Sequence, residues 1–258
     1  MTFNTLNRII TFLFLCSPLL SGCVNTTVTT NQTSLPTDIY LLIGQSNMAG
    51  RAQISPDSMG LMKNVYLLNV EDTWEPAKNP LNRYSTVRKH ISMQRLGPGY
   101  SFAEAMQIAS PDTAIGLVVN AKGGSSITEW GNGSYFYQEA VRRTNRAIAL
   151  GGELKGVLWH QGETDAEESE YLDKLIELVG RLREDFSNPD LIFIAGQIND
   201  TPLVNAQIAQ LPKRVRNTGF VSSEGLVAVD RWHFDAQSMK IMGQRYSEEM
   251  RRLQSSKE

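Results

Sequence analysis

Five short apolar segments recur along the chain, each followed by polar residues or glycine. They cover residues 39–43, 65–70, 114–120, 156–160 and 191–197. Short, mostly unbroken apolar runs of this length are typical of strands that are buried on both faces of a parallel sheet. Apolar residues at helical spacing occupy residues 137–148, 171–182 and 241–253. Strands that alternate with helices in this way predict a three-layer α/β/α sandwich.

Two further features refine this prediction. Thr164 and Glu167 have the spacing of a capping box, which predicts that a helix begins there and continues through 167–186. Residues 74–99 show no clear hydrophobic period. We therefore expect a long loop in that region, lying over the ends of the strands.

The amino-terminal segment has a different character. Arg8 precedes an apolar run over residues 9–20, which is too short to span a bilayer but fits the core of a secretory signal. The run ends in Leu-Ser-Gly-Cys, which resembles the bacterial lipoprotein cleavage box, although an ordinary cleavage site with an incidental cysteine is the alternative. The expected organisation is a leader over 1–22, a lipidated Cys23 with a polar, threonine-rich tether over 23–37, and one globular domain over 38–258.

This organisation predicts a protein that is secreted across the inner membrane and anchored to the bacterial cell envelope by lipid, facing the periplasm or the surface. The only other cysteine, Cys16, leaves with the leader, so the domain has neither a disulfide nor a cysteine nucleophile. The net charge is −2, and no Lys/Arg cluster is interleaved with aromatic residues, which argues against a nucleic-acid partner. These features leave the oligomeric state open.

A candidate nucleophile follows the first predicted strand. Ser46 lies two residues after Gly44, at the carboxyl end of the strand 39–43, where open α/β sheets bind their ligands. The motif differs from the nucleophile elbow of the α/β-hydrolases, because Met48 stands in place of the second glycine. A plain turn is the alternative interpretation.

Further candidate residues follow two other predicted strands. Gly123 and Gly124 come after the strand 114–120, where glycines leave backbone N–H groups open to a ligand. Gln161 and Glu163 follow the strand 156–160, and a neutral amide in this position is a suitable donor to an oxyanion.

The three histidines have different surroundings. His90 lies in the irregular loop and is expected to be solvated, whereas His160 at a strand end is expected to be packed and hydrogen-bonded. His233 follows Asp230 by three residues, a spacing that lets the carboxylate bind Nδ1 and orient Nε2 as a general base. Asp235 directly precedes the last predicted helix, so we interpret it as the helix cap.

Taken in order, these segments resemble a known group of proteins. They resemble the SGNH/GDSL hydrolase superfamily, and most closely its sialate O-acetylesterase-like branch, which includes carbohydrate esterase family 6. The resemblance begins near residue 38 and extends to the carboxyl end. It rests on four blocks: GQSNMAG at 44–50, GGSS at 123–126, WHQGE at 159–163 and DRWHFD at 230–235.

The resemblance implies a fold and a set of roles. The fold is flavodoxin-like, with five parallel strands between helical layers. Ser46 is implied as the nucleophile, His233 as the base and Asp230 as its partner. The implied oxyanion hole consists of the Ser46 N–H, the N–H of Gly123 or Gly124, and the Gln161 side chain, with Gln45, Asn47, His160 and Glu163 in support. The group needs no metal or cofactor.

The implied activity is that of a serine esterase, which removes O-acetyl groups from carbohydrates through an acetyl-enzyme intermediate. Both an acetylated plant polysaccharide such as acetylxylan and O-acetylated sialic acid remain open as substrates. Four aromatic residues could stack on a sugar or pack in the core: Trp74, Trp130, Tyr135 and Trp232.

Two alternatives belong to other classes. One is a non-catalytic carbohydrate-binding lipoprotein on an esterase-like fold, which would not need a complete set of catalytic side chains. The other is a metal-dependent hydrolase that uses His160, Glu163, Asp165 and His233. These residues match helix-borne zinc patterns poorly.

Overall fold

The computed structural model describes residues 1–2 and 35–256. Contacts define Ser34–Glu258 as one compact unit. Apart from residues 1 and 2, the predicted leader, Cys23 and the tether as far as residue 34 lie outside the described residues. Within the described part of the chain, no helix is both long enough and apolar enough to cross a membrane.

The end of the predicted tether packs against the domain. Pro36 is buried, and the Thr37 carbonyl accepts a hydrogen bond of 2.8 Å from the Glu153 N–H. The ordered fold therefore includes the two residues before the first strand.

Seven strands form one sheet in the order β3-β2-β4-β1-β5-β6-β7. Their bounds are β1 (Asp38–Gly44), β2 (Val65–Leu68), β3 (Trp74–Pro76), β4 (Ile115–Val119), β5 (Glu153–His160), β6 (Ile192–Gly196) and β7 (Thr218–Val221). Each neighbouring pair is parallel except β2 and β3, which are antiparallel. The predicted α/β/α fold class is confirmed.

The prediction of five strands is wrong in number, because β3 and β7 also belong to the sheet. Both are edge strands, of three and four residues. An edge strand is covered on fewer sides, so it needs no long apolar run, and β7 also contains Gly219. The hydrophobic pattern therefore carries little signal for either strand.

Helices cover both faces of the sheet. The α-helices are α1 (Ser46–Ala49), α2 (Gly99–Ala109), α3 (Tyr135–Ala149), α4 (Tyr171–Asp185), α5 (Pro202–Ile208), α6 (Leu211–Arg214) and α7 (Ala236–Ser255). The short 3-10 helices are η1 (Pro56–Ser58), η2 (Leu81–Tyr84), η3 (Ile91–Met93), η4 (Thr128–Trp130) and η5 (Glu163–Asp165).

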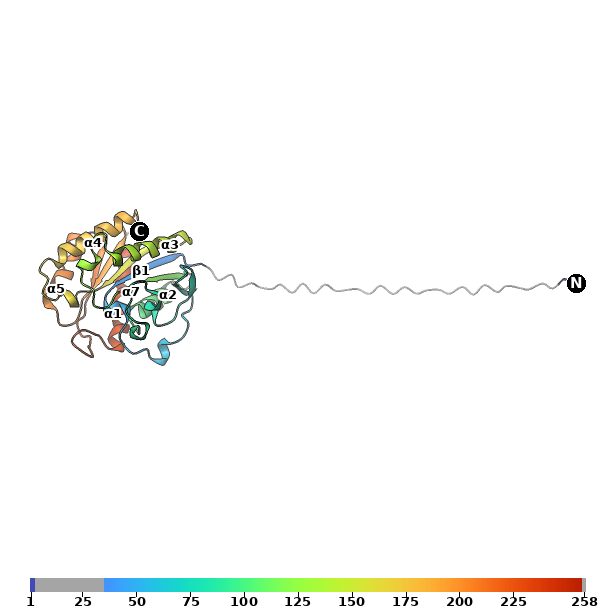
Figure 1. Cartoon of the computed structure of the whole chain (residues 1–258), viewed down its shortest axis with the longest axis horizontal. Coiled ribbons are helices and arrows are strands. Elements are labelled where there is room, and N and C mark those ends of the chain that lie inside the picture. Colours follow the sequence, from blue (N-terminus) through green and yellow to red (C-terminus); the bar gives the residue numbers. More distant parts are fainter. Residues whose placement is uncertain (3–34, 257–258) are drawn as a thin grey trace. The chain divides into compact units, whose positions relative to one another are not determined.

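The two faces of β1 enter different cores. Tyr40 and Leu42 pack with residues of α2 and α7, whereas Leu41 and Ile43 pack with residues of α3 and α4. Figure 1 shows α3 and α4 together on one side of the sheet. Burial on both faces explains why β1 is an unbroken apolar run rather than an alternating one.

The predicted helices exist, but one boundary was wrong. Segments 137–148 and 241–253 lie within α3 and α7, and the Asp235 side chain caps α7 by accepting from the Ser238 N–H at 2.7 Å. Helix α4 begins at Tyr171 instead of residue 167, because Thr164 lies in the separate turn η5. The expected loop over 74–99 is irregular except for β3, η2 and η3.

Candidate active site

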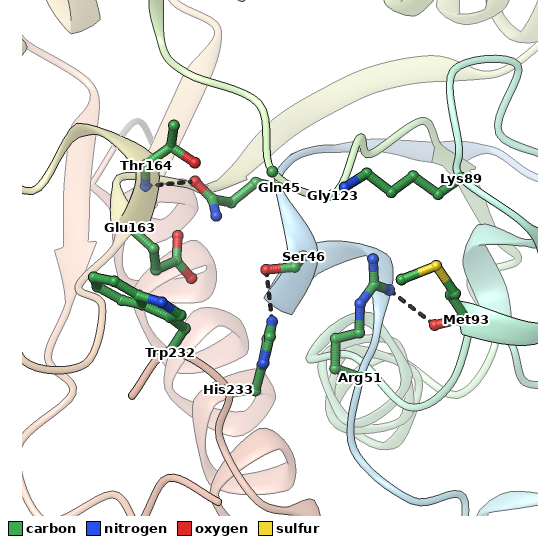
Figure 2. Close-up of a pocket in the computed structure, with 11 residues that line it drawn as sticks. Gln45, Ser46, Arg51, Lys89, Met93, Gly123, Glu163, Thr164, Trp232 and His233 are labelled. Atoms are coloured by element: carbon green, nitrogen blue, oxygen red, sulfur yellow. Dashed lines mark hydrogen bonds between the residues drawn. The ribbon is translucent and has the colours of Figure 1, made fainter. Parts of the chain in front are cut away.

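Loops at the carboxyl edge of the sheet bring the candidate residues together. Ser46 begins α1 directly after β1, Gly123 follows β4, and Glu163 follows β5. These three strands are adjacent and parallel, so their carboxyl ends meet at one edge. The segment that leads into α7 places His233 beside Ser46 (Figure 2).

Ser46, His233 and Asp230 form a continuous hydrogen-bonded chain. His233 Nε2 lies 3.0 Å from Ser46 Oγ, and His233 Nδ1 lies 2.8 Å from Asp230 Oδ2. Ser46 is 6% exposed, and the side chains of His233 and Asp230 are 26% and 52% exposed. Ser46 is thus largely shielded, while Asp230 lies at the rim.

Hydrogen bonds keep Asp230 ionised. Desolvation alone would raise its pKa, but hydrogen bonds from the His233 side chain and from the backbone N–H groups of Trp232 and His233 lower the pKa of Asp230 to about 2. The two backbone N–H groups lie 2.7 and 2.8 Å from Oδ1. An ionised carboxylate can only accept, so Nδ1 carries the imidazole proton and Nε2 is free to accept the Ser46 hydroxyl proton.

Three backbone N–H groups beside Ser46 are open. Those of Ser46, Gly123 and Gly124 donate to no backbone acceptor among the described residues. Gly124 has a φ of +76°, which favours glycine, and a Cβ on Gly123 would lie 2.3 Å from Arg51 Nη2. Glycine at these positions therefore allows the turn and leaves room for the Arg51 side chain, while the N–H groups of the turn have no backbone acceptor among the described residues.

Gln161 does not face this pocket. It is fully buried, and its Nε2 donates to Gln45 Oε1 at 3.1 Å, to the Ser125 carbonyl at 3.0 Å and to Asp165 Oδ2. These acceptors occupy both N–H bonds of the amide. The prediction that Gln161 donates directly to the oxyanion does not fit this geometry, because the sequence does not reveal the acceptors that turn the side chain inward.

Gln45 presents an amide to the pocket instead. Its Oε1 accepts hydrogen bonds from Gln161 Nε2, from the Gly162 N–H at 3.3 Å and from the Thr164 N–H at 3.4 Å. All three partners are donors, so the amide oxygen must face them and the NH₂ group must face the other way. Figure 2 shows this nitrogen directed toward the space between Ser46 and Glu163.

Asn47 connects helix α1 to the segment that contains His233. Its Nδ2 donates to Glu163 Oε1 at 2.6 Å and to the Trp232 carbonyl at 2.9 Å, and its Oδ1 accepts from the Phe234 N–H at 3.3 Å. Burial raises the pKa of Glu163 to about 8, so this carboxyl group is mainly protonated at neutral pH. Asn47 thus holds the residues on both sides of His233, and Glu163 holds Asn47.

His160 is packed beneath the site, as its strand-end position indicated. Its Nδ1 lies 3.2 Å from the Tyr246 hydroxyl, which donates its own proton to the Trp159 carbonyl at 2.6 Å. Burial lowers the pKa of His160 to about 3, so the ring is neutral. Its place is structural, outside the pocket that holds Ser46.

The pocket is a cavity of about 470 Å³, which is large enough for a sugar residue. It is lined by Gln45, Ser46, Arg51, Lys89, Met93, Gly123, Gly124, Glu163, Thr164, Trp232 and His233. Of the four aromatic candidates, only Trp232 is among these residues. Trp130 is fully buried against Trp159 and belongs to the core. In the described part of the chain, no group of three or more His, Cys, Asp or Glu residues could hold a metal ion.

Sequence reasoning missed the cationic wall of the pocket. Arg51 directly follows the block that contains Ser46, and this adjacency was the one available signal. Lys89 lies next to His90 in the irregular loop, where the sequence indicated only solvated side chains. Its place beside Gly124 becomes visible only when the loop is folded over the strand ends.

Known proteins are similar to this chain in sequence and in fold. The model of a family described as carbohydrate esterase, sialic acid-specific acetylesterase matches residues 36–252. A probable carbohydrate esterase of Arabidopsis thaliana is 31% identical in an alignment of 231 residues that covers 81% of this chain and 88% of the relative.

Solved structures give the same result at the level of the fold. An X-ray structure of an Arabidopsis thaliana protein has a TM-score of 0.76 at 30% identity, covering 84% of this chain and 98% of that chain. NanS has a TM-score of 0.70 at 18% identity, with coverage of 86% and 99%. A carbohydrate acetylesterase from Xanthomonas citri has a TM-score of 0.63 at 18% identity, with coverage of 85% and 57%.

Proposed function

We propose that this chain removes O-acetyl groups from carbohydrates through an acetyl-enzyme on Ser46. The chain belongs to the carbohydrate esterase, sialic acid-specific acetylesterase family and is a carboxylic ester hydrolase. One observation carries the mechanism: the hydrogen-bonded chain from Ser46 through His233 to Asp230 ends in a sugar-sized pocket beside open N–H groups.

In the first half of the reaction, Ser46 Oγ attacks the acetyl carbonyl carbon while its proton passes to His233 Nε2. The imidazolium that forms is stabilised by the ionised Asp230 on Nδ1. The tetrahedral intermediate then collapses. The bond between the carbonyl carbon and the sugar oxygen breaks, the sugar oxygen takes the proton from Nε2, and an acetyl ester remains on Ser46.

In the second half, water replaces the sugar. His233 Nε2 takes a proton from water as its oxygen bonds to the acetyl carbonyl carbon. As the second tetrahedral intermediate collapses, the bond between the acetyl carbon and Ser46 Oγ breaks and Oγ takes the proton from Nε2. Acetic acid leaves and ionises to acetate at neutral pH.

Both tetrahedral intermediates carry a negative oxygen that needs donors. We assign these donors to the N–H groups of Ser46 and of Gly123 or Gly124, together with the NH₂ group of Gln45. Gln45 fits this role because its oxygen is anchored by Gln161, Gly162 and Thr164 while its nitrogen faces the pocket. A donor that is fixed in advance stabilises the developing charge without reorganisation. In this assignment, Gln161 is a positioning residue for Gln45.

A non-catalytic carbohydrate-binding role is less well supported. Binding a sugar does not require a serine aligned at 3.0 Å from an imidazole whose other nitrogen meets an ionised carboxylate. Aromatic and polar contacts would suffice for binding alone.

We also propose that Cys23 carries lipid and that the domain is held at the bacterial cell envelope, facing the periplasm or the surface. The apolar run over residues 9–20 and the Leu-Ser-Gly-Cys sequence that follows it support this proposal. The polar residues between Cys23 and the domain would serve as the tether.

Acetate release from acetylated xylo-oligosaccharides and from O-acetylated sialic acid tests the catalytic proposal. S46A should lower kcat by about 10⁴-fold or more, as loss of a triad nucleophile does elsewhere. S92A makes the same chemical change at an exposed serine near the site and should retain wild-type activity. A folded S46A protein that keeps a tenth of the wild-type rate would show that Ser46 is not the nucleophile.

A further inference from the structure

Two cations line one wall of the active-site pocket without an acidic partner. Arg51 and Lys89 both face the cavity that contains Ser46 (Figure 2). Neither forms an ion pair with a carboxylate among the described residues. Arg95 lies in the adjoining hollow, which Arg51 also lines, and adds a third positive charge nearby. This wall therefore carries uncompensated positive charge.

Arg51 is held in place by neutral groups. Its Nη1 donates to the carbonyls of Gly50 at 2.7 Å and Met93 at 2.9 Å, which fixes the guanidinium without neutralising it. Its Nε and Nη2 have no hydrogen-bond acceptor in the described part of the chain. Burial and the charge of Arg95 both lower the pKa of Arg51.

The open edge of Arg51 lies next to the reacting centre. A Cβ placed on Gly123 would be 2.3 Å from Arg51 Nη2 and 3.7 Å from Ser46 Cβ, so the guanidinium and the nucleophile flank the same glycine. Lys89 reaches the neighbouring glycine, because a Cβ on Gly124 would lie 3.2 Å from Lys89 Nζ. A group bound by these cations would belong to the sugar that carries the ester, or to the sugar next to it.

The acids of the pocket do not cancel this charge. Glu163 is mainly protonated at neutral pH, because burial raises its pKa to about 8. Asp230 is ionised and lines the adjoining hollow together with Arg51 and Arg95, but its carboxylate is bound to His233 and forms no ion pair with either arginine among the described residues. Trp232 stands across Ser46 from Arg51 and offers an apolar face for a sugar ring (Figure 2).

We propose that Arg51 and Lys89 form an anion subsite that binds a carboxylate of the acetylated substrate, so that the enzyme acts on O-acetylated acidic sugars in preference to neutral ones. The Nε and Nη2 edge of a guanidinium matches the two oxygens of a carboxylate, and Lys89 adds a point charge. Uronic acids and sialic acids share this carboxylate chemistry. The inference rests on the proposed esterase function.

Matched substrates separate the subsite from the esterase activity. We would measure kcat/KM for acetate release from an O-acetylated methyl glucuronide and from its uronamide, which differ only in bearing a carboxylate or an uncharged amide at one carbon. O-acetylated sialic acid and its C1 amide form the second pair. A neutral O-acetylated methyl glucoside reports the esterase activity alone.

The wild-type enzyme should prefer the carboxylate of at least one pair about tenfold or more, and added salt should reduce that preference. R51Q should lower the carboxylate-to-amide ratio of kcat/KM about 10- to 100-fold, since charge-assisted hydrogen bonds are lost. K89Q should lower the ratio about 2- to 5-fold, because Lys89 is more exposed. K63Q removes an exposed cation outside this pocket and should leave the ratio unchanged.

The outcomes are distinguishable. Equal wild-type rates on acid and amide in both pairs would overturn the subsite, and so would a similar loss on acid and amide in R51Q. R51K keeps the charge without the planar fork, so an intermediate ratio supports bidentate binding even if R51Q does not fold. A preference confined to one pair supports the subsite and identifies its source as uronic or sialic acid. No acetate from any substrate, including the neutral glucoside, would refute the proposed function itself.

Discussion

Replacing Gln45 by glutamate isolates one donor of the proposed oxyanion hole. The variant keeps the Oε1 acceptor that binds Gln161 Nε2 and the N–H groups of Gly162 and Thr164, at 3.1, 3.3 and 3.4 Å. Only the NH₂ group that faces the pocket is exchanged for a second oxygen. The fold around residue 45 should therefore persist while the donor disappears.

The size of the effect follows from this geometry. Removing one preorganised oxyanion donor lowers kcat by about 10²- to 10³-fold, or about 3–4 kcal/mol of transition-state stabilisation. A carboxylate at this position would also repel the oxyanion, so we expect kcat to fall at least 10²-fold in Q45E. KM should change little, because the acetyl oxygen of the bound ester carries no full charge.

Steady-state acetate release, together with thermal unfolding to confirm the folded state, measures this effect. Q161M is the matched control, because it removes a fully buried amide whose N–H groups stay within the protein. It should lower the free energy of unfolding by about 1–3 kcal/mol and lower kcat less than Q45E does. If folded Q161M loses 10²-fold in kcat while Q45E loses less than tenfold, Gln161 is the donor and our assignment is wrong.

Three further predictions concern the triad acid, the buried carboxyl group and the anchor. D230N should lower kcat for acetate release by about 10³- to 10⁴-fold, because the amide cannot stabilise the imidazolium. D235N still caps α7, so its kcat should stay within twofold of that of wild type. A larger loss of kcat in D235N than in D230N would show that Asp235 is the triad acid. The pKa of Glu163 is raised from 4.5 to about 8, so its protonated form stabilises the fold fully below pH 4.5 and this contribution is lost as pH rises through 8. Chemical denaturation of E163Q and wild type should give a difference in unfolding free energy that changes by up to about 1.4 kcal/mol per pH unit between these two pKa values. A difference that stays constant with pH would contradict the raised pKa of Glu163. C23A should produce a precursor that takes up no labelled fatty acid, and labelling equal to that of wild type would refute the anchor.

The sequence revealed the central strands and the residues at their ends. The run 39–43 is apolar because β1 is buried on both faces, and this run marks the strand end that Ser46 follows. The hydrophobic pattern did not predict the edge strands β3 and β7, because short edge strands need no apolar run. Thr164 and Glu167 match a capping box, yet Thr164 belongs to η5 and its N–H donates to Gln45 instead.

The direction in which each side chain of the site points could not be predicted from the sequence. Gln45 and Gln161 are both amides next to strand ends, and nothing in the sequence distinguishes them as oxyanion donors. The difference arises from partners distant in sequence: Ser125 and Asp165 occupy the Gln161 amide, while the turn at 162–164 holds only the oxygen of Gln45. The approach of Arg51 to Gly123 likewise depends on how separate loops meet.

Direct detection of the acetyl-enzyme tests the central claim of this account. The purified enzyme would be mixed with an acetylated sugar that carries a deuterated acetyl group and quenched in acid within the first turnover, and its mass and proteolytic peptides would then be measured. We expect the mass of one labelled acetyl group on Ser46, absent from S46A and appearing more slowly in H233A, because His233 removes the serine proton. Rapid acetate release at substrate saturation, with no labelled acetyl on Ser46 at any time, would contradict a covalent mechanism through this residue.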